Sequence, residues 1–263
     1  MKKTLIVANW KMHLNTHEAS TLVHRLHENI KTHRTIEVVL APSMLTLQPI
    51  SLEIDSRRFK LASQDGYPKD DGPYTGEVSF AMMRELVDYS IIGHSARRIY
   101  FGEDQDLIRD KVQAAVRNGI TPILCVGETK QERAAGEAKM VISDQLTTAI
   151  SNLTAEEIEK IVIAYEPIWA ISTFDGEPSK PDDMRQAMDY IRRIIAELYG
   201  EVTAQNVRVL YGGSVDAHDV RAYLELVGCD GVLVGAASLN YRQFTGIVES
   251  AYTLQNELGE NNG

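Results

Sequence analysis

The sequence has 263 residues, of which 44% are hydrophobic and 24% are charged, and its formal net charge is −10 at pH 7. This length suits one large globular domain or two small ones, and the acidic balance argues against a nucleic-acid partner, which needs a basic face. Because no stretch of about 18 consecutive apolar residues occurs, we also expect no membrane span.

Two local features bear on the cellular compartment. The apolar run after Lys2 and Lys3 is too short for a secretory signal and continues directly into Asn9. The two cysteines, Cys125 and Cys229, lie in apolar segments without metal-ligand spacing, so we expect buried free thiols rather than a disulfide. Together these features predict a cytoplasmic protein.

Short runs rich in β-branched residues recur from one end of the chain to the other. Most are almost continuously apolar, which is typical of strands buried on both faces of a parallel sheet. They predict eight strands, at Thr4–Ala8, Glu37–Ala41, Phe59–Ser63, Tyr89–Gly93, Thr121–Val126, Ile161–Glu166, Val207–Tyr211 and Gly231–Val234.

Segments with helical spacing lie between these runs. Apolar residues repeat there at intervals of three and four residues, as on the buried face of an amphipathic helix. The pattern predicts helices at Thr16–Ile30, Asp106–Asn118, Pro181–Tyr199 and Ala217–Val227. We expect a disordered polar tail at Glu257–Gly263.

The alternation of strand and helix predicts parallel strands joined by helical crossovers. Eight such units in about 250 residues match a closed (β/α)₈ barrel, so we expect residues 1–263 to form a single barrel domain. The alternative is an open, doubly wound sheet, which usually carries a glycine-rich turn after its first strand. Here Asn9-Trp10-Lys11-Met12 follows that strand, which favours the barrel.

Polar and small residues gather where the predicted strands end. In a (β/α)₈ barrel the chemistry takes place at the carboxyl ends of the strands, so these residues are candidates for a site. They are Asn9 and Lys11 after the first strand, His94 and Ser95 after the fourth, Glu128 after the fifth, Glu166 closing the sixth, Gly212-Gly213-Ser214 after the seventh and Gly235-Ala236 after the eighth.

Two of these side chains suit proton transfer. Glu166 follows an apolar strand, where partial desolvation raises the pKa of a carboxyl group and makes it a better base. His94 precedes a predicted helix start, which disfavours the charged imidazole, so a neutral ring can donate a hydrogen bond to a carbonyl. We expect the other six histidines at the surface.

The remaining candidates suit an anionic substrate. Lys11, beside Asn9, can hold a phosphate dianion or a developing oxyanion. The small-residue turns after the last two strands can bind phosphate through backbone N–H groups. Alone, each feature is also compatible with an ordinary surface lysine or turn.

Six runs together make the chain similar to the triosephosphate isomerase family. They follow that family's order from the first strand to the last and span most of the chain. They are Ala8-Asn9-Trp10-Lys11-Met12, Tyr74-Thr75-Gly76-Glu77, Ile92-Gly93-His94-Ser95, Cys125-Val126-Gly127-Glu128-Thr129, Ala164-Tyr165-Glu166-Pro167-Ile168-Trp169-Ala170-Ile171 and Leu210-Tyr211-Gly212-Gly213-Ser214-Val215.

The resemblance implies an aldose–ketose isomerase of glycolysis and gluconeogenesis. Glu166 would take a carbon-bound proton from glyceraldehyde 3-phosphate or dihydroxyacetone phosphate, neutral His94 would polarise the carbonyl, and Lys11 with Asn9 would complement negative charge. Backbone N–H groups near Ser172, Ser214, Gly235 and Ala236 would hold the phosphate, and the loop after Trp169 would close over it. The resemblance implies no metal or organic cofactor, and a homodimer in which the loop around Thr75 inserts into the partner.

Three positions depart from the family pattern. Ala96 stands where a glutamate usually follows the His-Ser pair, and Ala236 stands where a second glycine is usual. The closing loop, residues 172–180, is about two residues longer than usual and carries Phe174 and Asp175 at its tip.

Two other functions stay open. The longer loop is compatible with an isomerase for a related tetrulose phosphate. Ala96 is compatible with an inactive barrel that binds phosphate, although such a protein has little reason to retain Lys11, His94 and Glu166 together.

Overall fold

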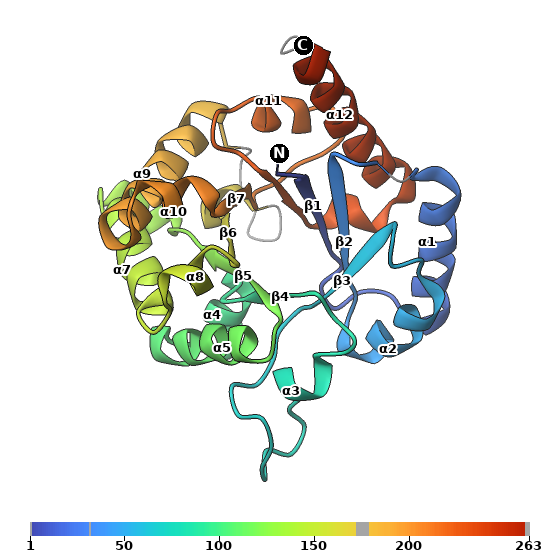
Figure 1. The fold of residues 1–263 in the computed structure, drawn as a ribbon, viewed down its shortest axis with the longest axis horizontal. Coiled ribbons are helices and arrows are strands. Elements are labelled where there is room, and N and C mark those ends of the chain that lie inside the picture. The colour runs from blue at the N-terminus through green and yellow to red at the C-terminus, as the bar shows by residue number, and fades with distance from the viewer. Residues whose placement is uncertain (1, 32, 172–178, 261–263) are drawn as a thin grey trace.

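The computed structural model describes residues 2–31, 33–171 and 179–260. In these residues eight parallel strands close into a barrel in chain order, because β8 pairs with β1 (Figure 1). The strands are β1 Thr4–Asn9, β2 Ile36–Ala41, β3 Phe59–Ser63, β4 Tyr89–Ile92, β5 Thr121–Val126, β6 Val162–Tyr165, β7 Arg208–Tyr211 and β8 Gly231–Val234. Each predicted strand lies within one residue of these bounds, and the closed ring excludes the open sheet.

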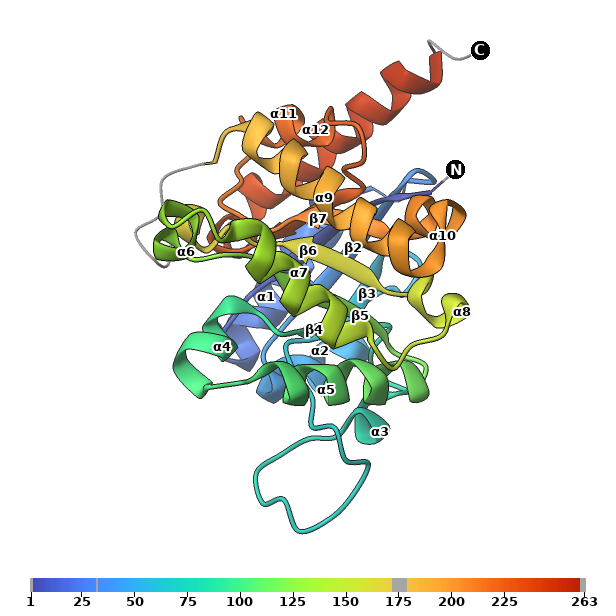
Figure 2. The ribbon, with the colours of Figure 1, turned by 90° about the vertical axis from the view of Figure 1, so that its left-hand side faces the viewer.

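Helices surround the barrel and cover the outer faces of its strands (Figures 1 and 2). They are α1 Thr16–Asn29, α2 Met44–Glu53, α3 Phe80–Met83, α4 Ser95–Phe101, α5 Gln105–Arg117, α6 Lys130–Ala134, α7 Ala138–Ile150, α8 Ala155–Ile158, α9 Pro181–Tyr199, α10 Glu201–Asn206, α11 Val220–Leu224 and α12 Tyr241–Glu260, with 3₁₀ helices η1 Ile168–Ala170 and η3 Ala236–Leu239. Three begin with a capping box, in which Asn15, Thr129 or Thr154 exchanges hydrogen bonds with a glutamate three residues later. Among the described helices, none has the length and apolar character that crossing a membrane requires.

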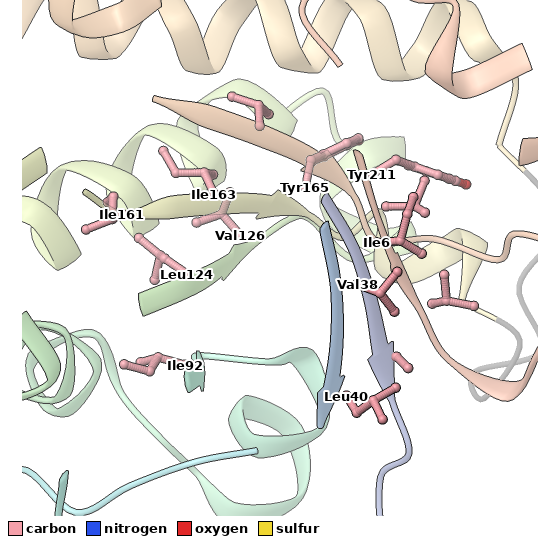
Figure 3. Close-up of a cluster of buried hydrophobic side chains, with 14 of the residues drawn as sticks. Ile6, Val38, Leu40, Ile92, Leu124, Val126, Ile161, Ile163, Tyr165 and Tyr211 are labelled. Atoms are coloured by element: carbon pink, nitrogen blue, oxygen red, sulfur yellow. The ribbon is translucent and has the colours of Figure 1, made fainter. Parts of the chain in front are cut away.

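The strand residues alternate between two apolar cores. On β1, Leu5 and Val7 point into the barrel, where they join an inner cluster, while Ile6 and Ala8 face the helices. This period of two follows from the pleat of a strand. Figure 3 shows part of the outer core, including Ile6 and Val38 on neighbouring strands. Both faces of each strand are therefore buried, which explains the continuous apolar runs in the sequence.

The C-terminal helix includes residues that the sequence predicted to form a disordered tail. Helix α12 runs to Glu260, so residues 257–260 of the expected polar tail are helical, and residues 261–263 lie outside the described residues. The Arg221 guanidinium of α11 donates to Glu257 Oε2 at 2.6 Å. The polar residues here cover an exposed helical surface, which composition alone does not distinguish from a disordered tail.

A long loop, residues 64–79, connects β3 to α3 and projects away from the barrel (Figure 2). Its two ends are joined where the Tyr67 N–H donates to the Val78 carbonyl at 2.9 Å. The rings of Tyr67 and Tyr74 pack at 4.5 Å between centroids. Thr75 is exposed on this loop.

Candidate active site

Glu166 and His94 meet at the carboxyl end of the barrel. His94 follows β4 and Glu166 follows β6, and His94 Nε2 lies 3.2 Å from Glu166 Oε1. Both residues are buried, with 7% and 2% of their surfaces exposed. They line one cavity of about 210 Å³ together with Asn9 and Lys11. The structure therefore brings together the four residues that the sequence singled out as catalytic.

The surroundings of His94 favour a neutral imidazole with its proton on Nε2. His94 is the N-cap of α4, and the Ala96 N–H donates to His94 Nδ1 at 3.1 Å, so Nδ1 acts as an acceptor. Burial lowers the pKa of His94, and the charges of Lys11 and Arg97 lower it further, while Glu166 opposes the shift. We assign the remaining proton to Nε2, which faces Glu166 and the cavity.

Glu166 is held by a backbone donor and by two glycines. Its Oε2 accepts a hydrogen bond from the Ser95 N–H at 3.1 Å. A Cβ at Gly127 would lie 1.9 Å from the Glu166 carbonyl oxygen, and one at Gly212 would lie 2.8 Å from Glu166 Cγ. A larger residue at position 127 would therefore displace the backbone of Glu166, and one at position 212 would displace its side chain, so Gly212 does more than turn the chain.

Lys11 occupies an unusual backbone conformation. Its φ is +51°, in the left-handed region that costs a non-glycine residue free energy. The Lys11 N–H donates to Asn9 Oδ1 at 3.1 Å, and the Gln64 amide donates to the Lys11 carbonyl at 2.8 Å and to that of Ala41 at 2.9 Å. Gln64 is a positioning residue that sequence reasoning missed, because nothing in the sequence ties it to Lys11.

The Lys11 ammonium faces both the carboxylate and the end of β8. Burial lowers the pKa of Lys11, and the negative charge of Glu166 opposes that shift. A Cβ built on Gly235 would lie 3.9 Å from Lys11 Nζ, so the cation lies beside the small residues that follow β8.

The candidate phosphate-binding residues line the same cavity. Ser214, Gly235 and Ala236 border it, and η3 begins at Ala236. The Ser214 N–H, however, donates to the Ala170 carbonyl at 3.1 Å. Ser172 lies outside the described residues, as do Phe174 and Asp175.

Glu128 faces away from this cavity and contacts the segment after β6. It is fully buried, and its carboxylate accepts hydrogen bonds from the Tyr165 hydroxyl at 3.1 Å and from Trp169 Nε1 at 2.8 Å. The Arg133 guanidinium stacks on the Trp169 ring, 4.3 Å from its centroid, and lies 3.5 Å from Glu128 Oε1. Glu128 thus anchors η1, which precedes the undescribed loop.

The exposure of the other histidines and of the two cysteines differs only slightly from what the sequence predicts. Of the seven histidines, only His94 is buried, while His27 and His33 are half-buried against Phe59 and Tyr252. Cys125 and Cys229 are free thiols, and only Cys125 is fully buried.

Comparison with known proteins identifies relatives over nearly the whole chain. The family model described as triosephosphate isomerase matches residues 4–251. A triosephosphate isomerase of Carboxydothermus hydrogenoformans is 39% identical over 95% of this chain and 100% of its own length. Those of Dehalococcoides mccartyi and Dictyoglomus turgidum are 38% and 39% identical, over 98% and 95% of this chain and the full length of each relative.

Proposed function

The chain belongs to the triosephosphate isomerase family, and we propose that it interconverts D-glyceraldehyde 3-phosphate and dihydroxyacetone phosphate with Glu166 as base and neutral His94 as electrophile. One observation carries the assignment of roles: the buried Glu166 carboxylate and His94 Nε2 lie 3.2 Å apart at the wall of one cavity. A base and a hydrogen-bond donor at this spacing can act on neighbouring atoms of one small substrate.

The reaction follows from these two groups. Glu166 takes a proton from the hydroxyl-bearing carbon beside the carbonyl, and the electron pair of the broken C–H bond forms a carbon–carbon double bond. The carbonyl oxygen then carries the negative charge of an enediolate, to which His94 Nε2–H donates. Proton movement between the two enediolate oxygens through His94 and return of the Glu166 proton to the other carbon complete the exchange.

Lys11 and Asn9 stabilise the negative charge that this path creates. Lys11 contributes a desolvated ammonium group, and charges interact more strongly in a site that excludes water. Asn9 Oδ1 accepts from the Lys11 N–H and supports the left-handed backbone there. Fixing this backbone before substrate binds avoids an ordering cost during the reaction.

Phosphate binding couples to the segment after β6. Ser214 donates its N–H to Ala170, so that N–H reaches a phosphate only after this hydrogen bond breaks. Movement of η1 away from Glu128 would release the Ser214 N–H from the Ala170 carbonyl. We expect this movement to accompany closure of the loop that contains Ser172. Gly235 and Ala236 would offer the backbone N–H groups at the start of η3.

A coupled assay with glyceraldehyde 3-phosphate tests this function against its two alternatives. We expect fast isomerisation of the three-carbon substrate and at least about a hundredfold lower kcat/KM for a four-carbon ketose phosphate. A preference for the four-carbon substrate would favour the tetrulose phosphate isomerase. Binding of glycerol phosphate without turnover would favour the inactive barrel.

A homodimer through the loop around Thr75 is the second part of the proposal. Large apolar side chains are exposed on segments that follow strands β1, β2 and β4, on either side of this loop in the barrel order. Among them are Met12, Leu45 and Ile99, at 93%, 74% and 47% exposure. Exposed apolar residues grouped in this way mark protein interfaces.

The two free thiols also favour the cytoplasmic location that the sequence predicts.

Sedimentation of Thr75→Arg tests the dimer. In the proposed dimer the interface would bury the arginine charge, so this variant should shift toward monomer and lose activity. Ser151→Arg, at an exposed helix end, should leave the oligomeric state and the activity unchanged. Monomeric wild type, or a Thr75→Arg variant that remains dimeric, would refute this interface.

A further inference from the structure

A second cavity lies at the opposite end of the barrel from the candidate active site. It has a volume of about 230 Å³ and is lined by a cluster of cationic side chains, here called the basic cleft. These side chains are Lys3, Lys31, Arg34, Arg57, Arg58 and Lys60.

Three chain segments bring these cations together. Lys3 directly precedes β1, and Lys31 and Arg34 lie between α1 and β2. Arg57 and Arg58 lie between α2 and β3, and Lys60 lies at the start of β3. All three segments lead into the amino ends of adjacent strands. The catalytic side chains instead follow the carboxyl ends of strands, so the basic cleft and the catalytic cavity are separate sites.

The concentration of positive charge contrasts with the rest of the chain. The cleft holds six of the 27 lysines and arginines in a protein whose net charge is −10. The carboxylate that lines the cleft, Glu37, accepts a hydrogen bond from the Tyr89 hydroxyl at 2.7 Å and lies 3.5 Å from the Arg208 guanidinium. The Glu37 carboxylate is therefore already paired with side chains of β4 and β7, Tyr89 and Arg208.

Four of the six cations form no ion pair with a carboxylate within the described structure. Arg57 pairs with Asp55 at 3.1 Å and Lys60 with Asp88 at 3.0 Å. Among residues 2–31, 33–171 and 179–260, no acidic side chain forms an ion pair with the exposed cations of the cleft's rim. Those cations are Lys3, Lys31, Arg34 and Arg58, and the Arg58 guanidinium donates to the His27 carbonyl at 2.8 Å.

Such an arrangement attracts anions. Like charges around a concavity repel one another and focus the electrostatic potential, so an anion bound between them relieves the repulsion. Guanidinium groups also present paired N–H donors that match the oxygens of a phosphate. Arginines and lysines from three segments can engage more than one phosphoryl group at once.

We propose that the basic cleft binds a compact multivalent phosphate, a small anion that carries two or more phosphoryl groups. The cleft is too small for an extended polymer, and the acidic surface elsewhere opposes a nucleic-acid backbone. Because the cleft is separate from the catalytic cavity, this binding does not depend on the proposed isomerase activity.

Titration calorimetry of the full chain with metal-free inorganic pyrophosphate tests the proposal. The double variant Lys31→Gln/Arg34→Gln removes two charges from the cleft. Lys160→Gln/Arg193→Gln is the matched control, since it removes two charges from exposed positions that do not line the cleft. Isomerase kinetics, including inhibition by pyrophosphate, report separately on the catalytic cavity.

We expect wild type to bind pyrophosphate at least tenfold more tightly than orthophosphate. The cleft variant should lose at least tenfold of this affinity and the control less than twofold, while kcat/KM and the pyrophosphate inhibition constant stay unchanged in both. Equal losses in the two variants, equal affinity for the two anions, or a parallel change in the inhibition constant would overturn the proposal. Tighter binding of a short RNA oligonucleotide than of pyrophosphate would overturn it as well.

Discussion

Shortening the proposed base by one methylene group is the sharpest perturbation of the site. In Glu166→Asp the carboxylate withdraws by about 1.5 Å, which breaks its contact with His94 Nε2 at 3.2 Å and with the Ser95 N–H at 3.1 Å. A misplacement of about 1 Å costs roughly a hundredfold in rate, or about 2.7 kcal/mol in activation free energy. We therefore expect kcat to fall by two or more orders of magnitude.

The kinetic pattern of this variant distinguishes a chemical from a structural effect. A coupled assay with glyceraldehyde 3-phosphate should show the loss in kcat with KM within about threefold of wild type, because the carboxylate acts in the transition state. Glu156→Asp, with the same shortening on an exposed helix, should match wild type. Rates for Glu166→Asp equal to those of wild type would refute the role of Glu166.

Three further changes test the supports of the site. Gly212→Ala places a Cβ 2.8 Å from Glu166 Cγ and should reduce kcat about tenfold or more, whereas Gly259→Ala, with open space around it, should not. Gln64→Leu removes both hydrogen bonds that fix the Lys11 and Ala41 carbonyls, so kcat/KM should drop about tenfold, and an unchanged value would contradict its positioning role. Burial lowers the pKa of His94 in the folded protein, so the unfolded chain binds more protons below pH 6.5. When the pH falls from 7.5 to 5.5, the free energy of unfolding of wild type should therefore fall by up to about 1.4 kcal/mol more than that of His94→Gln. Denaturant titrations that give equal losses for the two proteins would contradict this.

The strands were the most predictable part of the fold. Both faces of a strand such as β5 are buried, so Thr121–Val126 is an almost unbroken apolar run and its ends coincide with the structure. Short helices such as α8 and α10 carry too few turns for a periodic signal. At the C-terminus, the polar composition predicts disorder, but residues 257–260 are helical and Glu257 of α12 accepts a hydrogen bond from Arg221 of α11. Composition alone does not reveal this long-range contact.

The candidate site was predictable in its members but not in its geometry. Because the carboxyl ends of all strands meet at one end of a barrel, Lys11, His94 and Glu166 were expected near one another. The sequence could not indicate that Glu128 turns toward Trp169 instead, or that Gln64 fixes Lys11. Both outcomes depend on side-chain directions and on contacts between residues far apart in the chain.

Hydrogen exchange with solvent tests the central claim, that Glu166 removes a carbon-bound proton of the substrate, most directly. Dihydroxyacetone phosphate would be incubated in D₂O with wild type and with Glu166→Gln, which keeps the shape of the side chain but removes the base. We predict that deuterium enters the carbon beside the carbonyl with wild type, and that exchange and isomerisation both slow by at least about a thousandfold in the variant. Exchange in Glu166→Gln within tenfold of wild type would contradict the account.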